Sequence, residues 1–247
     1  YDYLQYQFNS QSLPRDQVSG RSLRLLKARS SIDLRLGDTA SPEPRTRPDQ
    51  GHRSSRLALG AGRQWGRDFL EFKLRPAYHD LLDPTDGYTR GAQINFLDFN
   101  IRRYLDDDES LRLESFTLVD IVSVTPRDRF FAAKSWKVAA GWRRLNPLLH
   151  TQQPLAFFFE GGVGPSYALG DNTLLTLMVE GNLEAESRLE KGYDAALGGT
   201  INLRWQSNNL NASLGAGRYE YLETENLSRA EYRLDLGITL TPQSSLR

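Results

Sequence analysis

The sequence predicts an all-β fold: an antiparallel transmembrane β-barrel of about 10–12 strands, preceded by a short helix and a linker. Three observations support this expectation. Apolar and polar residues alternate with a period of two in ten segments, most of these segments reach at least nine residues, and aromatic residues stand at the ends of apolar faces. Alternation of this kind indicates strands, because successive side chains of a strand point to opposite faces of the sheet.

Composition excludes several classes of protein. The 247 residues carry 31 Lys and Arg against 31 Asp and Glu, and there is no cysteine. A zero net charge argues against a nucleic-acid partner, because phosphate binding needs a basic surplus. The absence of cysteine removes thiol nucleophiles, thiolate metal sites and disulfides. No apolar run approaches the ~18 residues of a membrane-spanning helix. We expect no cofactor and no metal.

The first 50 residues differ from the rest of the chain. Tyr1–Phe8 predicts a short strand, and Ser19–Ile32 predicts a short helix of modest amphipathicity. Gly37–Gly51 holds three prolines among polar residues and is typical of a linker. We therefore expect an N-terminal segment over residues 1–50 and the barrel over residues 51–247. Because the chain begins at Tyr1 without a methionine, we expect it to be a mature or excised piece.

The clearest strands lie in the second half of the chain. Tyr193–Trp205 alternates without a slip over thirteen residues, and Ala230–Leu240 and Leu175–Glu184 follow the same rule. Seven weaker segments complete the ten: Arg56–Gln64, Phe69–Tyr78, Gln93–Tyr104, Leu111–Val124, Ser135–Leu145, Leu155–Tyr167 and Leu210–Tyr221. The apolar phase slips by one residue after Phe96 and again after Leu113, and such slips predict β-bulges. Short connections without a βαβ rhythm predict antiparallel pairing.

The direction of the apolar face decides between a membrane barrel and a soluble one. A soluble sandwich or barrel buries its apolar face, whereas a membrane barrel turns it toward lipid and keeps polar residues within. Membrane strands need ~9–11 residues, close to the lengths found here. Tyr193 and Trp205 lie twelve residues apart on one apolar face, which projects to roughly 30 Å for a tilted strand. The aromatic residues expected at the membrane interface are Trp136, Trp142, Tyr193, Trp205 and Tyr232.

Seven short motifs, in order and spacing, resemble a known family. They are His52–Leu57, Leu74–Asp83, Ile94–Asp98, Val119–Ile121, Ser123–Asp128, Phe130–Phe131 and Ser135–Trp136. The stretch is similar to the carboxy-terminal part of the Lnb-type proteobacterial envelope proteins. In that family a periplasmic, cysteine-dependent domain precedes a β-barrel-like region, and some relatives of the periplasmic domain N-acylate lipoproteins. The resemblance is specific over residues 51–136 and rests on strand pattern alone beyond them.

Two departures from that family limit what the resemblance implies. The chain has no cysteine, so the nucleophile of the family is absent and acyl transfer is not carried over to this chain. Outer-membrane barrels usually end in a strand that closes with Phe or Trp, whereas this chain ends at Ser244-Ser245-Leu246-Arg247. One or two terminal strands are then expected to be missing, which would make the complete barrel twelve-stranded.

A cluster at a strand end is the strongest candidate site. His79, Asp80 and Asp83 could supply a general base or an oriented imidazole, with Ser54 or Ser55 as a nucleophile. The alternative is a hydrogen-bond network that ties a turn to Arg75 and Arg127. The residues expected to form a polar network at the rim and in the lumen are Arg75, Tyr78, Asp98, Arg102, Asp120, Arg127 and Asp128. His52 and His150 stand alone in the sequence, and the run 106–109 lacks the glycine and final Glu of a calcium loop.

Three functional hypotheses follow. The favoured one is a structural barrel in the bacterial outer membrane, which anchors or supports an upstream periplasmic domain or partner protein and has no catalytic activity of its own. The second is a barrel enzyme that acts on lipids at the membrane rim through His79. The third is a soluble barrel that binds a small apolar ligand and therefore turns Leu197, Ile201 and Leu203 inward.

Overall fold

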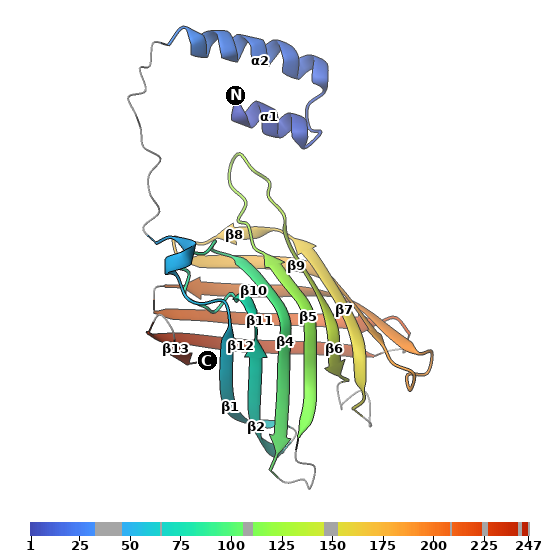
Figure 1. Ribbon diagram of the computed structural model, residues 1–247. Coiled ribbons are helices and arrows are strands. Elements are labelled where there is room, and N and C mark those ends of the chain that lie inside the picture. The colour runs from blue at the N-terminus through green and yellow to red at the C-terminus, as the bar shows by residue number, and fades with distance from the viewer. Residues whose placement is uncertain are drawn as a thin grey trace. The chain divides into compact units, whose positions relative to one another are not determined.

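The computed structural model describes residues 1–32, 46–64, 66–105, 111–145, 153–207, 209–223, 227–241 and 244–246 (Figure 1). The chain divides into two compact units, Tyr1–Pro44 and Arg45–Arg247. Most of the expected linker, the acidic run 106–109 and His150 lie outside the described residues.

The first unit contains two helices, α1 (Asp2–Asn9) and α2 (Arg15–Ser30). The strand expected over Tyr1–Phe8 is therefore wrong: Leu4 and Phe8 are four residues apart, which places them on one face of a helix. Leu4 and Val18 are the buried residues of α1 and α2. No helix among the described residues is long and apolar enough to cross a membrane.

The second unit opens with the short 3-10 helix η1 (Pro48–Gln50) and is otherwise a β-sheet, so the expected all-β class is confirmed. Among the described residues, ten strands have nine residues or more: β1 (Arg56–Gln64), β2 (Arg67–Arg75), β4 (Ala92–Tyr104), β5 (Arg112–Ser123), β6 (Ser135–Arg144), β7 (Leu155–Gly164), β9 (Thr173–Ala185), β10 (Tyr193–Gln206), β11 (Leu210–Tyr221) and β12 (Ser228–Thr241). Three strands have three residues each: β3 (Ala77–His79), β8 (Ser166–Ala168) and β13 (Ser244–Leu246).

Proline divides two of the expected strands. The segment expected over Phe69–Tyr78 is split into β2 and β3 at Pro76, and Leu155–Tyr167 is split into β7 and β8 at Pro165. Proline has no N–H to donate to a ladder, so it interrupts pairing where it occurs. β3 then continues along β4, and β8 continues along β9.

All strand pairs are antiparallel, in the order β1-β2-β4-β5-β6-β7-β9-β10-β11-β12-β13. Within the described residues β1 pairs only with β2, and β13 pairs only with β12, so the sheet has two open edges. The structure thus supports an antiparallel meander, but it does not form the closed barrel that the sequence led us to expect. Figure 1 shows this sheet twisting and curling along its length.

One of the two expected bulges is confirmed, in the ladder of β4 with β5. Asn100 pairs with Ser115 and Ile101 with Leu113, so Glu114 is the extra residue in one register shift. The bulge expected after Phe96 is not formed, because Phe96 pairs with Val119 and Asp98 with Thr117 in one register, although Leu97 between them has a positive φ of 57°. A further register shift lies between Thr117 and Val119, in the ladder of β5 with β6. Such bulges increase the local twist, which helps this sheet to curl.

The two faces of the sheet have opposite polarity. On β10, Leu197 and Ile201 are 54% and 47% exposed, whereas Asp194 and Arg204 on the other face are buried to 5% and 8%. The neighbouring strand β9 repeats the pattern, because Val179 is exposed and Glu180 is buried. The exposed apolar side chains continue over β1, β2, β11 and β12. The apolar face of the sheet is therefore its exposed outer face, and the polar side chains lie within the curl.

Candidate functional site

The loop after β3 crosses from one side of the curled sheet to the other. Gln206 at the end of β10 donates from Nε2 to the carbonyl oxygen of Leu81 at 3.0 Å. Asn211 of β11 donates from Nδ2 to the carbonyl oxygens of Leu82 and Asp83 at 3.1 and 2.9 Å. Gly237 of β12 lies against the same loop, since a Cβ there would stand 3.1 Å from the Leu82 oxygen. These contacts fix the loop over one end of the interior.

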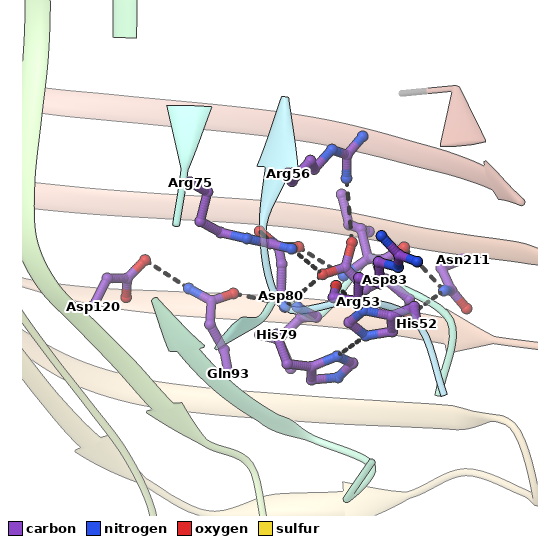
Figure 2. Close-up of polar contacts among 12 residues, drawn as sticks. His52, Arg53, Arg56, Arg75, His79, Asp80, Asp83, Gln93, Asp120 and Asn211 are labelled. Atoms are coloured by element: carbon purple, nitrogen blue, oxygen red, sulfur yellow. Dashed lines mark hydrogen bonds and ion pairs between the residues drawn. The ribbon is translucent and has the colours of Figure 1, made fainter. Parts of the chain in front are cut away.

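Asp83 is the centre of a buried ion cluster at this end, which we call the rim cluster (His52, Arg56, Arg75, His79, Asp80 and Asp83). Arg75 Nη2 donates to Asp83 Oδ2 at 2.6 Å, and Arg56 Nη1 donates to Oδ1 at 3.2 Å (Figure 2). The backbone N–H of Asp80 donates to the same carboxylate at 2.9 Å. Asp83 is 5% exposed. A buried carboxylate with two guanidinium partners is strongly held, because removing either charge leaves the other uncompensated.

The histidines of the rim cluster meet edge to edge. His52 Nε2 lies 2.7 Å from His79 Nδ1, although the two residues are 27 positions apart (Figure 2). His52 Nδ1 lies 2.8 Å from the carbonyl oxygen of Arg53, which can only accept, so Nδ1 carries a proton. In a neutral His52 the Nε2 atom then carries no proton, and its lone pair points at His79 Nδ1.

Tyr88 covers both imidazoles. Its ring stacks on His52 with centroids 4.2 Å apart and on His79 with centroids 4.4 Å apart. Its hydroxyl donates to the carbonyl oxygen of His52 at 2.8 Å. Burial lowers the pKa of His79 to about 4, against the opposing attraction of Asp83 and Asp80. His79 is therefore neutral near pH 7.

His52, His79 and Asp83 offer three ligand atoms that all lie within 4.8 Å of one another. This corrects the expectation that His52 stands alone. Of the predicted site residues, the structure brings His79, Asp80, Asp83 and Arg75 into the rim cluster. The nitrogen His79 Nδ1 pairs with His52 and not with a serine, so the hydrogen bond that would activate Ser54 or Ser55 from this atom is not formed.

Two further predicted residues connect to the rim cluster or lie beside it. Asp120 of β5 accepts a hydrogen bond from Gln93 Nε2 at 2.6 Å, and Gln93 in turn accepts from the backbone N–H of Leu81 at 3.3 Å. Tyr78 is 53% exposed, and its ring packs edge-on against Phe96. The sequence placed both residues in one network, but only Asp120 reaches the loop.

The remaining predicted polar residues lie elsewhere. Arg102 donates to Glu71 at 2.7 Å, and half-buried Asp98 lies on the same strand, β4. Arg127 is exposed in the loop after β5, where its backbone N–H donates to the Ser166 carbonyl rather than to the rim cluster. Asp128 Oδ1 accepts the backbone N–H groups of Phe130 and Phe131, both at 2.6 Å. The predicted tie between the turn and Arg127 is therefore not formed in the described part of the chain.

The predicted interface aromatics lie mainly on the exposed apolar side. Trp136, Tyr193, Trp205 and Tyr232 are exposed. Trp142 is half-buried, because its ring stacks near Phe116 and meets Phe157 edge-on.

A second polar group fills the interior, and we call it the interior network (Lys137, Arg143, Glu160, Glu180 and Glu184). Lys137 lies 2.6 Å from Glu180 and 3.8 Å from Glu160, and Arg143 lies 3.0 Å from Glu160 and 2.9 Å from Glu184. These side chains line two adjoining cavities of about 410 and 620 Å³. Side chains from β2, β4–β7 and β9–β12 line the larger cavity, so they converge on one interior.

Fold and site together define a curled antiparallel sheet with an apolar outer face, an ion-paired interior and a histidine–carboxylate cluster at one end. The chain belongs to the DUF7840 family, which is described as a domain of unknown function, and the family model matches residues 45–247. Comparison with curated proteins and with solved structures finds no match.

Proposed function

We propose that residues 45–247 form the wall of a β-barrel in the bacterial outer membrane, which anchors a preceding periplasmic domain and has no catalytic activity of its own. The observation that carries this proposal is the polarity of the sheet. Apolar side chains face outward over most of the long strands, and ion-paired side chains face inward. A transmembrane barrel has this arrangement, whereas a soluble barrel has the reverse.

The size of the exposed apolar face supports contact with lipid rather than water. Leu57 and Leu59 on β1 and Leu234 on β12 are each more than 60% exposed, at opposite ends of the sheet order. Soluble proteins rarely expose continuous apolar patches beyond a few hundred Å². The soluble alternative also needs Leu197, Ile201 and Leu203 to point inward, and all three are among the exposed residues.

Strand length and edges agree with the same proposal. The ten long strands have 9 to 14 residues, and membrane strands need ~9–11. The edges at β1 and β13 would be paired in the membrane, because each unpaired backbone group costs several kcal/mol in lipid. The anchoring role follows the resemblance to Lnb-type proteins, in which a periplasmic domain precedes the barrel-like region.

The test is the orientation of single strands. The chain has no cysteine, so one introduced cysteine accepts a fluorescent label at a unique position. One set of variants labels the outer face: Leu197→Cys, Leu203→Cys and Leu236→Cys. The matched set labels the inner face of the same strands: Asn202→Cys, Arg204→Cys and Asp235→Cys.

Each labelled protein is reconstituted into vesicles that contain brominated lipid, and quenching is compared with that by aqueous iodide. We expect the leucine positions to be quenched by the lipid and the polar positions to be shielded from it. If the leucine positions are quenched by iodide alone, or are protected from both quenchers, the membrane proposal is wrong.

A further inference from the structure

We propose that His52, His79 and Asp83 bind one zinc ion, which ties the segment before β1 to the loop after β3. Two imidazoles and one carboxylate are ligands that zinc prefers, and three protein ligands leave a fourth position for water. The proposal does not depend on membrane insertion, since all three residues lie in one compact unit at one end of the sheet.

The distances suit zinc after a small movement. Zinc bonds of ~2.0–2.1 Å at tetrahedral angles separate two ligand nitrogens by roughly 3.3 Å. His52 Nε2 and His79 Nδ1 are now 2.7 Å apart. One ligand atom of His52, one of His79 and one of Asp83 all lie within 4.8 Å of one another, so the carboxylate must also approach the two rings. The imidazoles must therefore move apart by roughly 0.6 Å to admit the ion. His52 can make this movement, because it lies outside the strands and is only half-buried.

The surroundings already orient the ligands. Histidines that bind metals usually donate their other ring N–H to a carbonyl or carboxylate, and His52 Nδ1 makes this bond to the Arg53 carbonyl. The stacked ring of Tyr88 holds both imidazoles near one plane. Asp83 is fixed by Arg75 and by the Asp80 N–H at its Oδ2 atom.

Arg56 competes with the ion for the other oxygen. It donates to Asp83 Oδ1 at 3.2 Å, which is longer than the 2.6 Å bond of Arg75 to Oδ2. The Arg56 side chain is 19% exposed, whereas that of Arg75 is 5% exposed, so Arg56 is the partner that can turn toward water. We therefore assign Oδ1 as the ligand atom, with Arg56 displaced when zinc binds. This displacement relieves the repulsion between the guanidinium and the dication.

The experiment measures zinc affinity of the full 247-residue chain in detergent micelles. The protein carries no polyhistidine tag, is stripped with EDTA, and competes with a chromophoric chelator for added ZnCl₂. We expect one zinc per chain. His52→Gln and His79→Gln should each weaken binding at least about tenfold, because loss of a residue that merely supports a metal ligand already costs roughly that much. His150→Gln, which changes the remaining histidine, serves as the matched control and should bind as the wild type does.

A fourth variant tests the displacement itself. Arg56→Gln removes the competing cation and should bind zinc at least as tightly as the wild type. Far-UV circular dichroism checks that each variant folds. If His79→Gln does not fold, the zinc affinity of His52→Gln tests the proposal alone, because His52 lies outside the strands. The proposal is overturned if the wild type binds no zinc, if His52→Gln binds as tightly as the wild type, or if His150→Gln weakens binding equally.

Discussion

Replacing Glu180 by glutamine should destabilise the sheet by about 3–4 kcal/mol. The carboxylate of Glu180 on β9 accepts three donors from three other strands. Lys137 Nζ lies at 2.6 Å, Thr200 Oγ1 at 2.6 Å and Tyr219 Oη at 2.7 Å. Glu180 is 5% exposed, so its partners have limited access to replacement by bulk water. One side chain thus joins β6, β9, β10 and β11.

The magnitude follows from what an amide can replace. A hydrogen bond to a charged group contributes about 1.5–3 kcal/mol, and a neutral one about 0.5–1.5 kcal/mol. Glutamine turns three charge-assisted bonds into neutral ones, each weaker by about 1 kcal/mol. Its NH₂ group must in addition face either Lys137, which can only donate, or a hydroxyl, which must rotate to accept. Lys137 then keeps a carboxylate partner only in Glu160, at 3.8 Å.

The assay is urea unfolding in detergent micelles, followed by tryptophan fluorescence. Glu220→Gln on β11 is the matched control, because Glu220 pairs with Arg218 where the two side chains are 57% and 72% exposed. An exposed pair contributes about 0–1 kcal/mol, so this control should unfold near the wild-type midpoint. If Glu180→Gln and Glu220→Gln differ by less than about 1 kcal/mol, the interior network does not hold the strands together as argued.

Three other predictions use the same unfolding assay or a titration. Gly164→Ala should lower the free energy of unfolding by about 1–3 kcal/mol, because the new Cβ would lie 1.9 Å from the Leu177 carbonyl oxygen. Gly181→Ala is the control: its Cβ would meet open space, so it should cost far less. Equal costs would contradict the packing of β7 against β9. Leu197→Arg should cost about 2–4 kcal/mol in vesicles if this position meets lipid, and less than about 0.5 kcal/mol if it meets water. Lys191 lowers the pKa of Glu223, and Glu223 raises the pKa of Lys191. This loop pair therefore stabilises the fold at pH values between the two pKa values, where both groups are charged. The stabilisation is lost as the pH falls through the pKa of folded Glu223. Carboxyl-detected NMR should therefore find a higher Glu223 pKa in Lys191→Met, and an unchanged value would refute the pairing.

The long strands could be predicted from the sequence because each shows period-two alternation over many residues. The expected segment Arg56–Gln64 coincides with β1, and Leu210–Tyr221 coincides with β11. A three-residue strand has no measurable period, so alternation does not separate β3 and β8 from their neighbours, and only Pro76 and Pro165 mark the breaks. The helix α1 is too short for periodicity to identify it, because eight residues permit both a strand pattern and a helix pattern.

The partner of His79 could have been found from the register of one hairpin. Arg56 pairs with Arg75 in the β1–β2 ladder. His52 precedes Arg56 by four residues, and His79 follows Arg75 by four residues, so an extended register brings the two histidines opposite each other. Spacing along the chain does not reveal this proximity, whereas the register of the folded hairpin does. By contrast, the contact of Asp83 with Asn211 spans 128 residues and depends on the curl of the whole sheet, which alternation alone does not determine.

The structure shows where many of the balanced charges lie, which charge counts alone could not reveal. Equal numbers of acidic and basic residues are compatible with a solvated surface of mixed sign. In the folded chain, however, many of these charges meet inside the curl: Arg102 with Glu71, Lys137 with Glu180, and Arg75 with Asp83. A charge that leaves water needs a close counter-charge, because an unpaired buried ion is far more costly than a paired one. A sheet that encloses its charged face therefore requires nearly equal numbers of acidic and basic side chains in its interior. A net charge of zero is explained by this requirement as well as by a mixed outer surface.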